Sequence, residues 1–409
     1  MTVATLLRNT LRNPSGRRSL LLAASACLIS FATFWAAQRA AGVSMIDLMV
    51  YRAEGRTVLD GRDLYAMRAT SVQLPATYPP FAALLFTPLT LPGVPGLRTL
   101  ATAGNLLLLV VFAQLSLRLT LPADRLPRPW VTALWVAALA VWCEPVWTTL
   151  RYGQINLLLA VAVVWDLTRR DGHRWAGAGT GFAAAIKLTP ALFAVLFLIV
   201  GLVRAREEGW NPWLRRAATA AVVFCAATLA AAAVLPRDSL HFWSMTLFET
   251  HRVGSAENAA NQSLRGVLAR LLHTGEPTLW WTATAAAVAV LGLATAVAAA
   301  LRGERAAAMA VCAATALLIS PVSWSHHWVW CVPIALFLWA RAGARWALAA
   351  ALVFCSYALW WVPHGTGRPE LAQGAAEMAL SALYPLTAVA LIGYAAVAVV
   401  RPWRTSRTA

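Results

Sequence analysis

The sequence predicts an all-α protein that crosses a membrane many times. Of its 409 residues, 60% are hydrophobic and only 12% are charged, and the mean hydropathy is +0.63. Long apolar runs alternate with short loops that are rich in arginine. This composition is typical of polytopic membrane proteins. The net charge of +17 therefore reflects the loops between membrane spans, and we expect no nucleic-acid partner.

The apolar runs predict about twelve membrane crossings, although several runs are shorter than the roughly twenty residues that span a bilayer. The runs cover residues 20–37, 97–119, 130–147, 155–167, 175–186, 190–203, 217–235, 279–301, 306–319, 328–340, 346–361 and 378–400. The segment 81–92 is short and contains prolines, so we expect it to be re-entrant or interfacial. The first run follows several arginines, as in a signal peptide, but it is long and lacks a small-residue cleavage site. We therefore expect it to remain as the first span.

The basic residues predict the orientation in the plasma membrane. With the N-terminus inside, the expected cytoplasmic segments carry 21 of the 34 basic and 6 of the 17 acidic residues, a net +15 against +2 outside. The positive-inside rule then places both termini in the cytoplasm and the polar motifs on the outer, periplasmic face. We expect one transmembrane domain over residues 1–409, with a first outer loop at 38–96 and a long outer loop at 236–278.

Asp47 is the first candidate for a catalytic group. It lies about ten residues after the first apolar run, and its neighbours within Ile46–Val50 are apolar. Apolar surroundings raise the basicity of a carboxylate, and a carboxylate held at a membrane face is a candidate general base. Capping of a helix that lies on the membrane is the structural alternative.

Four further residues are candidates for binding a phosphate. Arg52 could hold a phosphate through two hydrogen bonds or could extend toward the membrane interface. Lys187 is the only lysine in the chain, and it interrupts an apolar stretch just before a proline, so its ammonium must face a cavity or the interface. His326 and His327 stand at the outer mouth of an expected span, where one of them could donate to a phosphate oxygen. Adjacent histidines diverge on a helix, so we expect no metal site.

A second set of polar and aromatic residues is suited to binding sugar hydroxyls or stacking on sugar rings. Amides fit the hydroxyl role, and tryptophans near an interface have an aromatic belt as their structural alternative. Glu144, at the outer end of a span, is a carboxylate in reserve. The set comprises Tyr51, Tyr78, Glu144, Gln154, Asn156, Asn261, Gln262 and Trp324.

The six cysteines predict neither a disulfide framework nor a zinc site. All lie inside apolar runs or at their ends, and none has a paired spacing. We interpret them as small hydrophobic residues.

As a set, these motifs resemble glycosyltransferase family 87, whose members are actinobacterial polyprenol-phosphate-mannose-dependent α-1,2-mannosyltransferases of the GT-C fold. The resemblance covers nearly the whole chain and implies a GT-C bundle of helices. It also implies transfer of mannose from polyprenyl-phosphate-mannose, with inversion, to a mannose-containing glycolipid or lipoglycan of the cell envelope. Neither a nucleotide sugar nor a metal or other cofactor is implied. The motifs are Asp47-Leu-Met-Val-Tyr-Arg, Tyr78-Pro-Pro-Phe, Tyr152-Gly-Gln-Ile-Asn, Lys187-Leu-Thr-Pro, Asn261-Gln-Ser and Ser320-Pro-Val-Ser-Trp-Ser-His-His-Trp.

The resemblance also implies roles for individual residues. Asp47 matches the expected general base, and His326 or His327 matches the histidine at the outer mouth of a span. Lys187, Arg52 and Gln154 are placed to contact the donor phosphate or sugar. The alternative function is a transporter or flippase of a lipid-linked sugar, which predicts internal repeats and polar residues near the midplane of the bilayer. The polar motifs of this sequence gather at one face instead.

Overall fold

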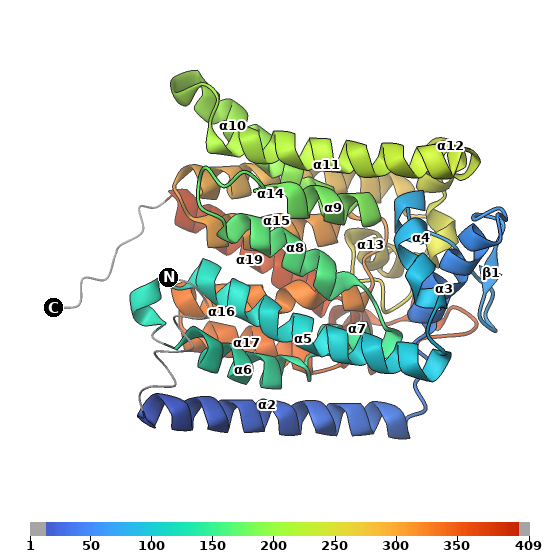
Figure 1. The fold of residues 1–409 in the computed structure, drawn as a ribbon, viewed down its shortest axis with the longest axis horizontal. Coiled ribbons are helices and arrows are strands. Elements are labelled where there is room, and N and C mark those ends of the chain that lie inside the picture. Colours follow the sequence, from blue (N-terminus) through green and yellow to red (C-terminus); the bar gives the residue numbers. More distant parts are fainter. Residues whose placement is uncertain (1–13, 127, 401–409) are drawn as a thin grey trace.

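The computed structural model describes residues 14–126 and 128–400 as a bundle of α-helices. The long helices run in roughly one direction, and the short helices and most of the loop structure gather at one end of them (Figure 1). The all-α prediction is thus confirmed. The two termini, which we expect in the cytoplasm, lie outside the described residues.

Within the part of the chain that the structure describes, twelve helices form the body of the bundle and pack around a large apolar core. Their bounds are α2 Pro14–Ala40, α5 Val94–Thr120, α6 Pro129–Ala140, α8 Asn156–Thr168, α9 Ala178–Ile186, α10 Ala191–Glu208, α11 Pro212–Val234, α14 Thr278–Leu301, α15 Arg305–Ile319, α16 Cys331–Ala342, α17 Ala344–Cys355 and α19 Leu383–Val400.

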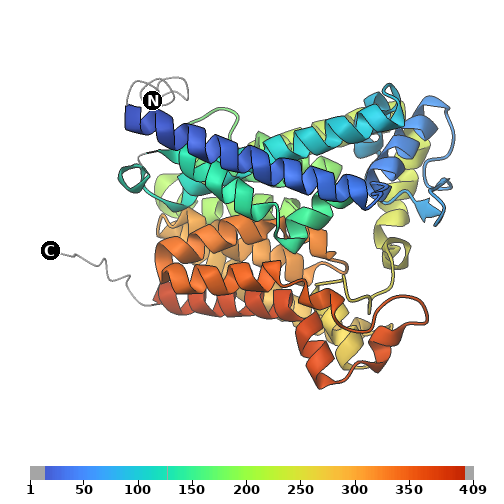
Figure 2. The same ribbon diagram turned by 90° about the horizontal axis from the view of Figure 1, so that it is seen from below.

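The short elements lie mainly at the end of the bundle that carries the polar motifs. They include one small antiparallel pair of strands, β1 Arg68–Ala69 and β2 Leu74–Pro75. A group formed by α13 and the chain from η6 to α18 stands beside the bundle at this end (Figure 2). The short helices are α3 Ile46–Leu59, α4 Pro80–Phe86, η1 Thr87–Thr90, η2 Ala123–Arg125, α7 Glu144–Tyr152, α12 Pro236–Ser244, η3 Thr246–Phe248, η4 Thr250–Val253, α13 Leu264–Leu271, η5 Ser325–Trp330, η6 Ala358–Trp360, η7 Pro369–Ala372 and α18 Ala375–Ser381.

The count of about twelve crossings predicted by the twenty-residue rule is not confirmed. Within the described residues, four helices are long and apolar enough to cross a membrane: α2, α5, α11 and α14. The bent pairs α6–α7 and α18–α19, with angles of 79° and 67°, raise the number to six if each is one span. Three other predicted spans are shorter apolar helices, at Asn156–Thr168, Arg305–Ile319 and Ala344–Trp360. The segment Pro80–Thr90, which we expected to be re-entrant or interfacial, is also a short apolar helix.

Burial inside the protein explains part of this difference. In α15 all thirteen residues from Ala306 to Leu318 are buried. A helix that is apolar on every side can be surrounded by protein as well as by lipid. An apolar run therefore does not by itself distinguish a short interior helix from a membrane span.

Two local features position the polar end. Helix α3 crosses the segment α4–η1 closely, because Gly55 has no side chain and a Cβ there would lie 2.4 Å from the carbonyl oxygen of Phe86. A break that begins at Lys187 separates helix α9 from helix α10. The backbone of Lys187 is extended (φ −149°, ψ 127°). Pro190 follows at the start of α10 and disfavours helix in the residue before it. The predicted break at the lysine is thus present.

Candidate active site

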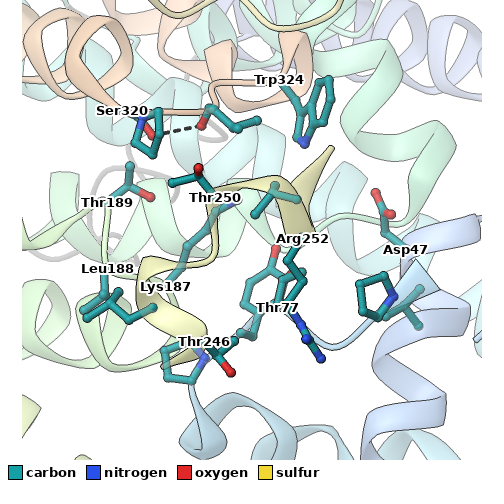
Figure 3. A pocket seen from close by; sticks show the side chains of 18 of the residues that line it. Asp47, Thr77, Lys187, Leu188, Thr189, Thr246, Thr250, Arg252, Ser320 and Trp324 are labelled. Atoms are coloured by element: carbon teal, nitrogen blue, oxygen red, sulfur yellow. Dashed lines mark hydrogen bonds between the residues drawn. The ribbon is translucent and has the colours of Figure 1, made fainter. Parts of the chain in front are cut away.

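A cavity of about 350 Å³ opens at the polar end of the bundle. Its wall is built from α3, the segment 74–79, the turn at Gln154, the break between α9 and α10, the segment 242–253 and the turn 320–327. Figure 3 shows Asp47 on one side of this cavity and Lys187 on the other, with Arg252 between them in the view. Residues far apart in the sequence therefore share one polar site.

Asp47 lies in the first turn of α3, where the N-terminal end of a helix favours a negative charge. Its Oδ2 accepts a hydrogen bond of 2.6 Å from Nε2 of Gln154. Burial raises the pKa of the Asp47 carboxyl to about 6, while the Gln154 hydrogen bond and the charge of Lys187 act in the opposite direction. A carboxylate with this pKa is ionised at neutral pH and is more basic than an ordinary aspartate.

A chain of hydrogen bonds holds Gln154, the hydrogen-bond partner of Asp47, in place. The hydroxyl of Tyr51, one turn after Asp47 on α3, donates to Oε1 of Gln154 at 2.7 Å. It also lies 2.9 Å from the hydroxyl of Tyr78. Gln154 follows Gly153, whose positive φ of 68° ends α7 and allows the chain to pass close to α3. The amide of Gln154 is thereby fixed with its NH₂ group toward the carboxylate.

Lys187 supplies a buried cation on the opposite wall. Its Nζ donates to Oδ1 of Asn156 at 3.3 Å and lies 2.9 Å from Nε2 of His327. Burial lowers the pKa of Lys187 to about 8, and the charge of Asp47 partly offsets this effect. Burial and the lysine charge lower the pKa of His327 well below its ordinary value. His327 is therefore neutral, and its Nε2 accepts from the ammonium.

The histidine turn η5 is fastened from two sides. The carbonyl oxygen of His326 accepts from Oγ1 of Thr149 at 2.8 Å and from Nδ2 of Asn156 at 2.9 Å. Trp324, which also lines the cavity, pairs through its backbone with Asn261. Among the described residues, the buried Nε2 of His326 has no hydrogen-bond partner. Both histidines line the cavity.

Glu144 does not line the cavity, so its prediction as a sugar-binding residue is not supported. It is completely buried at the start of α7. Its Oε1 accepts from Thr148 at 2.8 Å, from Ser325 at 2.8 Å and from the indole of Trp360 at 3.1 Å. Its Oε2 accepts from Tyr384 at 3.0 Å. The carboxylate thus joins four elements, including the turn that carries the histidines.

We expect Glu144→Ala to lower the free energy of unfolding by roughly 3 kcal/mol, because it leaves four buried donors without an acceptor. The measurement is the thermal unfolding midpoint in detergent. Glu144→Gln is the matched control, since its amide oxygen can still accept three of the four hydrogen bonds. A midpoint of Glu144→Ala equal to that of the wild type would contradict this role.

Arg52 and the amides of the long loop also do not line the cavity. The Arg52 guanidinium donates to the carbonyl oxygens of Thr90 and Pro92 at 3.2 and 3.3 Å, so it fastens α3 to the chain after α4. Oδ1 of Asn261 accepts from the backbone of Ser323 at 3.0 Å. Gln262 is equally buried and donates to backbone carbonyls. These side chains hold the segments at the polar end of the bundle together.

Arg252 is the main cavity residue that the sequence did not single out. Its Nε donates to the carbonyl oxygen of Ala76 at 3.0 Å, and another nitrogen donates to that of Tyr65. These contacts fasten the segment 236–278 to the segment 38–96. Its sequence signal was weak, because many arginines occupy the loops. The other polar lining residues that the sequence did not single out are Thr77, Thr189, Thr246, Glu249, Thr250 and Ser320.

Among the described residues, no group of three or more histidine, cysteine, aspartate or glutamate side chains could hold a metal ion. The chemical groups that line the cavity include the carboxylate of Asp47 with its raised pKa, the buried ammonium of Lys187, two imidazoles and several hydroxyls. A second carboxylate, that of Glu249, and the guanidinium of Arg252 also line it. This set can accept a proton at one wall and stabilise an anion at the other.

A model of glycosyltransferase family 87 matches residues 76–321, more than half of the chain. The chain is 37% identical over 312 residues to a protein of Mycolicibacterium smegmatis, covering 71% of this chain and 68% of the relative. It is 35% identical over 327 residues to a protein of Mycobacterium tuberculosis, covering 75% and 73%. Both relatives are named polyprenol-phosphate-mannose-dependent alpha-(1-2)-phosphatidylinositol mannoside mannosyltransferase.

Another relative from Mycobacterium tuberculosis, named for a phosphatidylinositol pentamannoside substrate, is 34% identical and covers 73% of this chain and 67% of its own length. A crystal structure of ArnT from Cupriavidus metallidurans bound to undecaprenyl phosphate aligns with 92% of this chain and 77% of its own. Its TM-score is 0.43 at 14% identity, a level that carries no inference about fold or ligand. The family match and the identities to the mycobacterial relatives show that this chain belongs to glycosyltransferase family 87.

Proposed function

We propose that this protein transfers mannose from polyprenyl-phosphate-mannose to a phosphatidylinositol mannoside and forms an α-1,2 linkage with inversion. The observation that carries the proposal is that a carboxylate, Asp47, and an ammonium, Lys187, lie on opposite sides of one cavity. The donor and the linkage come from the names of the relatives, which share both. Relatives acting on differently mannosylated acceptors match similarly well, so identity does not select the number of mannoses on the acceptor.

In the proposed reaction, Asp47 is the general base. Its carboxylate takes the proton of an acceptor hydroxyl while the hydroxyl oxygen attacks the anomeric carbon of mannose. The bond between that carbon and the phosphate oxygen breaks on the opposite face, which inverts the configuration. The leaving group is the polyprenyl phosphate, and its developing negative charge is stabilised by the Lys187 ammonium, with His326 and His327 beside it. Gln154 keeps the carboxylate oriented.

The proposal includes a GT-C type of fold and a cavity on the outer face of the plasma membrane. The loops expected outside by the positive-inside rule supply the cavity wall, and the basic loops expected in the cytoplasm join the long helices elsewhere. A lipid-linked donor suits this location, because it carries its activated sugar to a face where nucleotide sugars are absent. Reporter fusions at the segments 60–75 and 300–305 test it, with an exoplasmic signal expected from the first only.

The deciding experiment supplies the purified protein with synthetic polyprenyl-phosphate-mannose and a series of phosphatidylinositol mannosides and simple mannosides. We expect one new α-1,2-linked mannose in the product, identified by linkage analysis. Movement of a labelled donor between leaflets without a new glycosidic bond would instead favour the flippase alternative. Transfer that requires a nucleotide sugar would overturn the choice of donor.

The two shifted pKa values predict a bell-shaped dependence of kcat/KM on pH. The base must be deprotonated, so activity is present above the Asp47 pKa of about 6 and is lost as the pH falls through it. The ammonium must be protonated, so activity is lost as the pH rises through the Lys187 pKa of about 8. We expect a maximum near neutral pH in a transfer assay with the lipid-linked donor well below saturation. A rate that keeps rising above pH 9 would exclude a required lysine proton.

A further inference from the structure

Two cysteines that are far apart in the sequence meet at the polar end of the bundle. The sulfur of Cys143, in the bend between α6 and α7, lies 3.4 Å from that of Cys355, at the end of α17. Cys143 is half-buried, and Cys355 is exposed. The sequence indicated no such pair, because 212 positions separate the two residues. Neither sulfur lines the proposed active site.

Two hydrogen bonds next to the cysteine pair hold the two segments of the chain beside each other. The hydroxyl of Tyr357, two residues after Cys355, donates to the carbonyl oxygen of Trp142 at 3.2 Å. On the other side, the indole of Trp360 donates to Glu144 at 3.1 Å. The residues that flank Cys143 are therefore both fastened to the segment that follows Cys355. The sulfurs lie 3.4 Å apart in this arrangement, compared with about 2.05 Å in a disulfide.

From this arrangement we propose that Cys143 and Cys355 are joined by a disulfide in the mature protein. The proposal rests on the outer-face location given above, because thiols in the cytosol are kept reduced. The two thiols lose two electrons and two protons, and the oxidant is another disulfide, carried by a thiol oxidoreductase or a small molecule. Cys355 attacks this disulfide and releases one thiol, and Cys143 then attacks the mixed disulfide and releases the second. Both released thiols carry the protons.

Cys331 is the competing partner. It is buried at the start of α16 and is within hydrogen-bonding reach of Cys143. Its Sγ is directed to the carbonyl oxygen of Val329 at 3.8 Å. An external oxidant must reach an exposed thiol first, and among these three cysteines only Cys355 is exposed. The order of exposure therefore favours the Cys143–Cys355 bond.

The bond would strengthen the scaffold behind the histidine turn. It joins the start of α7 to the chain leading into η6, and these segments supply two of the elements around the Glu144 carboxylate. Glu144 in turn accepts from Ser325, which precedes His326. The disulfide thus supports the arrangement of the site without contacting substrate.

The direct test is mass spectrometry on protein from membranes that are quenched in acid and then alkylated with N-ethylmaleimide in denaturant near neutral pH. After proteolysis without reductant, we expect a peptide pair linked through Cys143 and Cys355 that separates on reduction. Recovery of both cysteines as maleimide adducts would overturn the proposal. A link from Cys143 to Cys331 would overturn it as well.

Thermal unfolding provides a second test. We expect reductant to lower the unfolding midpoint of the wild type by about 4 °C or more, since the bond closes a long loop. The Cys143→Ser/Cys355→Ser variant should not respond to reductant. Cys225→Ser, which removes an exposed thiol on α11, is the matched control and should respond as the wild type does. An equal response of the double variant would contradict the proposal.

This result is separable from that of the proposed function. The double variant should retain mannosyl transfer at low temperature, because neither sulfur lines the cavity. If the wild type transfers mannose but contains no Cys143–Cys355 bond, only the disulfide proposal is overturned. Absence of transfer in the wild type would remove only the proposed reaction.

Discussion

Asp47→Asn is expected to reduce mannosyl transfer by about 10³-fold while the protein stays folded. Asparagine has nearly the same shape, and its amide oxygen can still accept from Gln154, so the wall of the cavity is preserved. It cannot take a proton from the acceptor hydroxyl at neutral pH. The measurement is the initial rate with synthetic polyprenyl-phosphate-mannose, and binding of the donor should be nearly unchanged.

Asp60→Asn is the matched control for this variant. Asp60 ends the same helix, but it forms ion pairs with Arg56 and Arg62 outside the cavity. Its replacement should leave the rate within about twofold of the wild type, because exposed ion pairs contribute little. Transfer by Asp47→Asn at the wild-type rate would exclude Asp47 as the base. Equal losses in both variants would indicate a general effect on the folding of α3.

Lys187→Met is expected to lower kcat/KM by about 10²-fold to 10³-fold, the range for removal of one group that stabilises charge in a transition state. Methionine matches the lysine side chain as far as Cε and removes the ammonium that lies against His327. If the ammonium acts mainly on the departing phosphate, kcat falls more than the affinity for the donor. Rates measured over a range of donor concentrations separate these two effects.

Arg56→Met serves as the control, because Arg56 is a cation at the same end of the molecule whose side chain is 64% exposed. It should change the rate little. The acid limb of the pH profile should persist in Lys187→Met while the alkaline limb disappears. Retention of the alkaline limb in that variant would assign it to another group.

Proximity of the site residues could be predicted only in part. Asp47, Gln154, Lys187 and His327 each stand in a short polar motif beside an apolar run, and the structure brings these motifs to one cavity. A polar motif beside an apolar run shows where the fold accepts polar side chains, so it identifies candidate site residues. It does not report the direction of each side chain. Arg52 belongs to the same motif as Asp47 and yet faces backbone carbonyls of another segment.

The residues whose surroundings the sequence did not indicate are those whose contacts come from distant parts of the chain. Glu144 is surrounded by donors from residues up to 240 positions away, and no local pattern indicates such an arrangement. Arg252 is one of many loop arginines until its contacts with residues 65 and 76 are known. The predicted number of spans is not confirmed for a related reason, since α15 is apolar and is buried among other parts of the protein.

The enclosure of α15 has a mechanical consequence. This helix leads directly into the chain that carries the histidines, and the protein surrounds it. The long helices α2 and α11, by contrast, lie mostly at the protein surface. Of the most apolar 18-residue stretch of each helix, only 17% and 22% is buried inside the protein. Changes in bilayer thickness are accommodated by tilting of helices that contact lipid. Helices α2 and α11 can thus tilt in membranes of different thickness, while the enclosed helix α15 keeps the two imidazoles in a fixed position relative to the rest of the site.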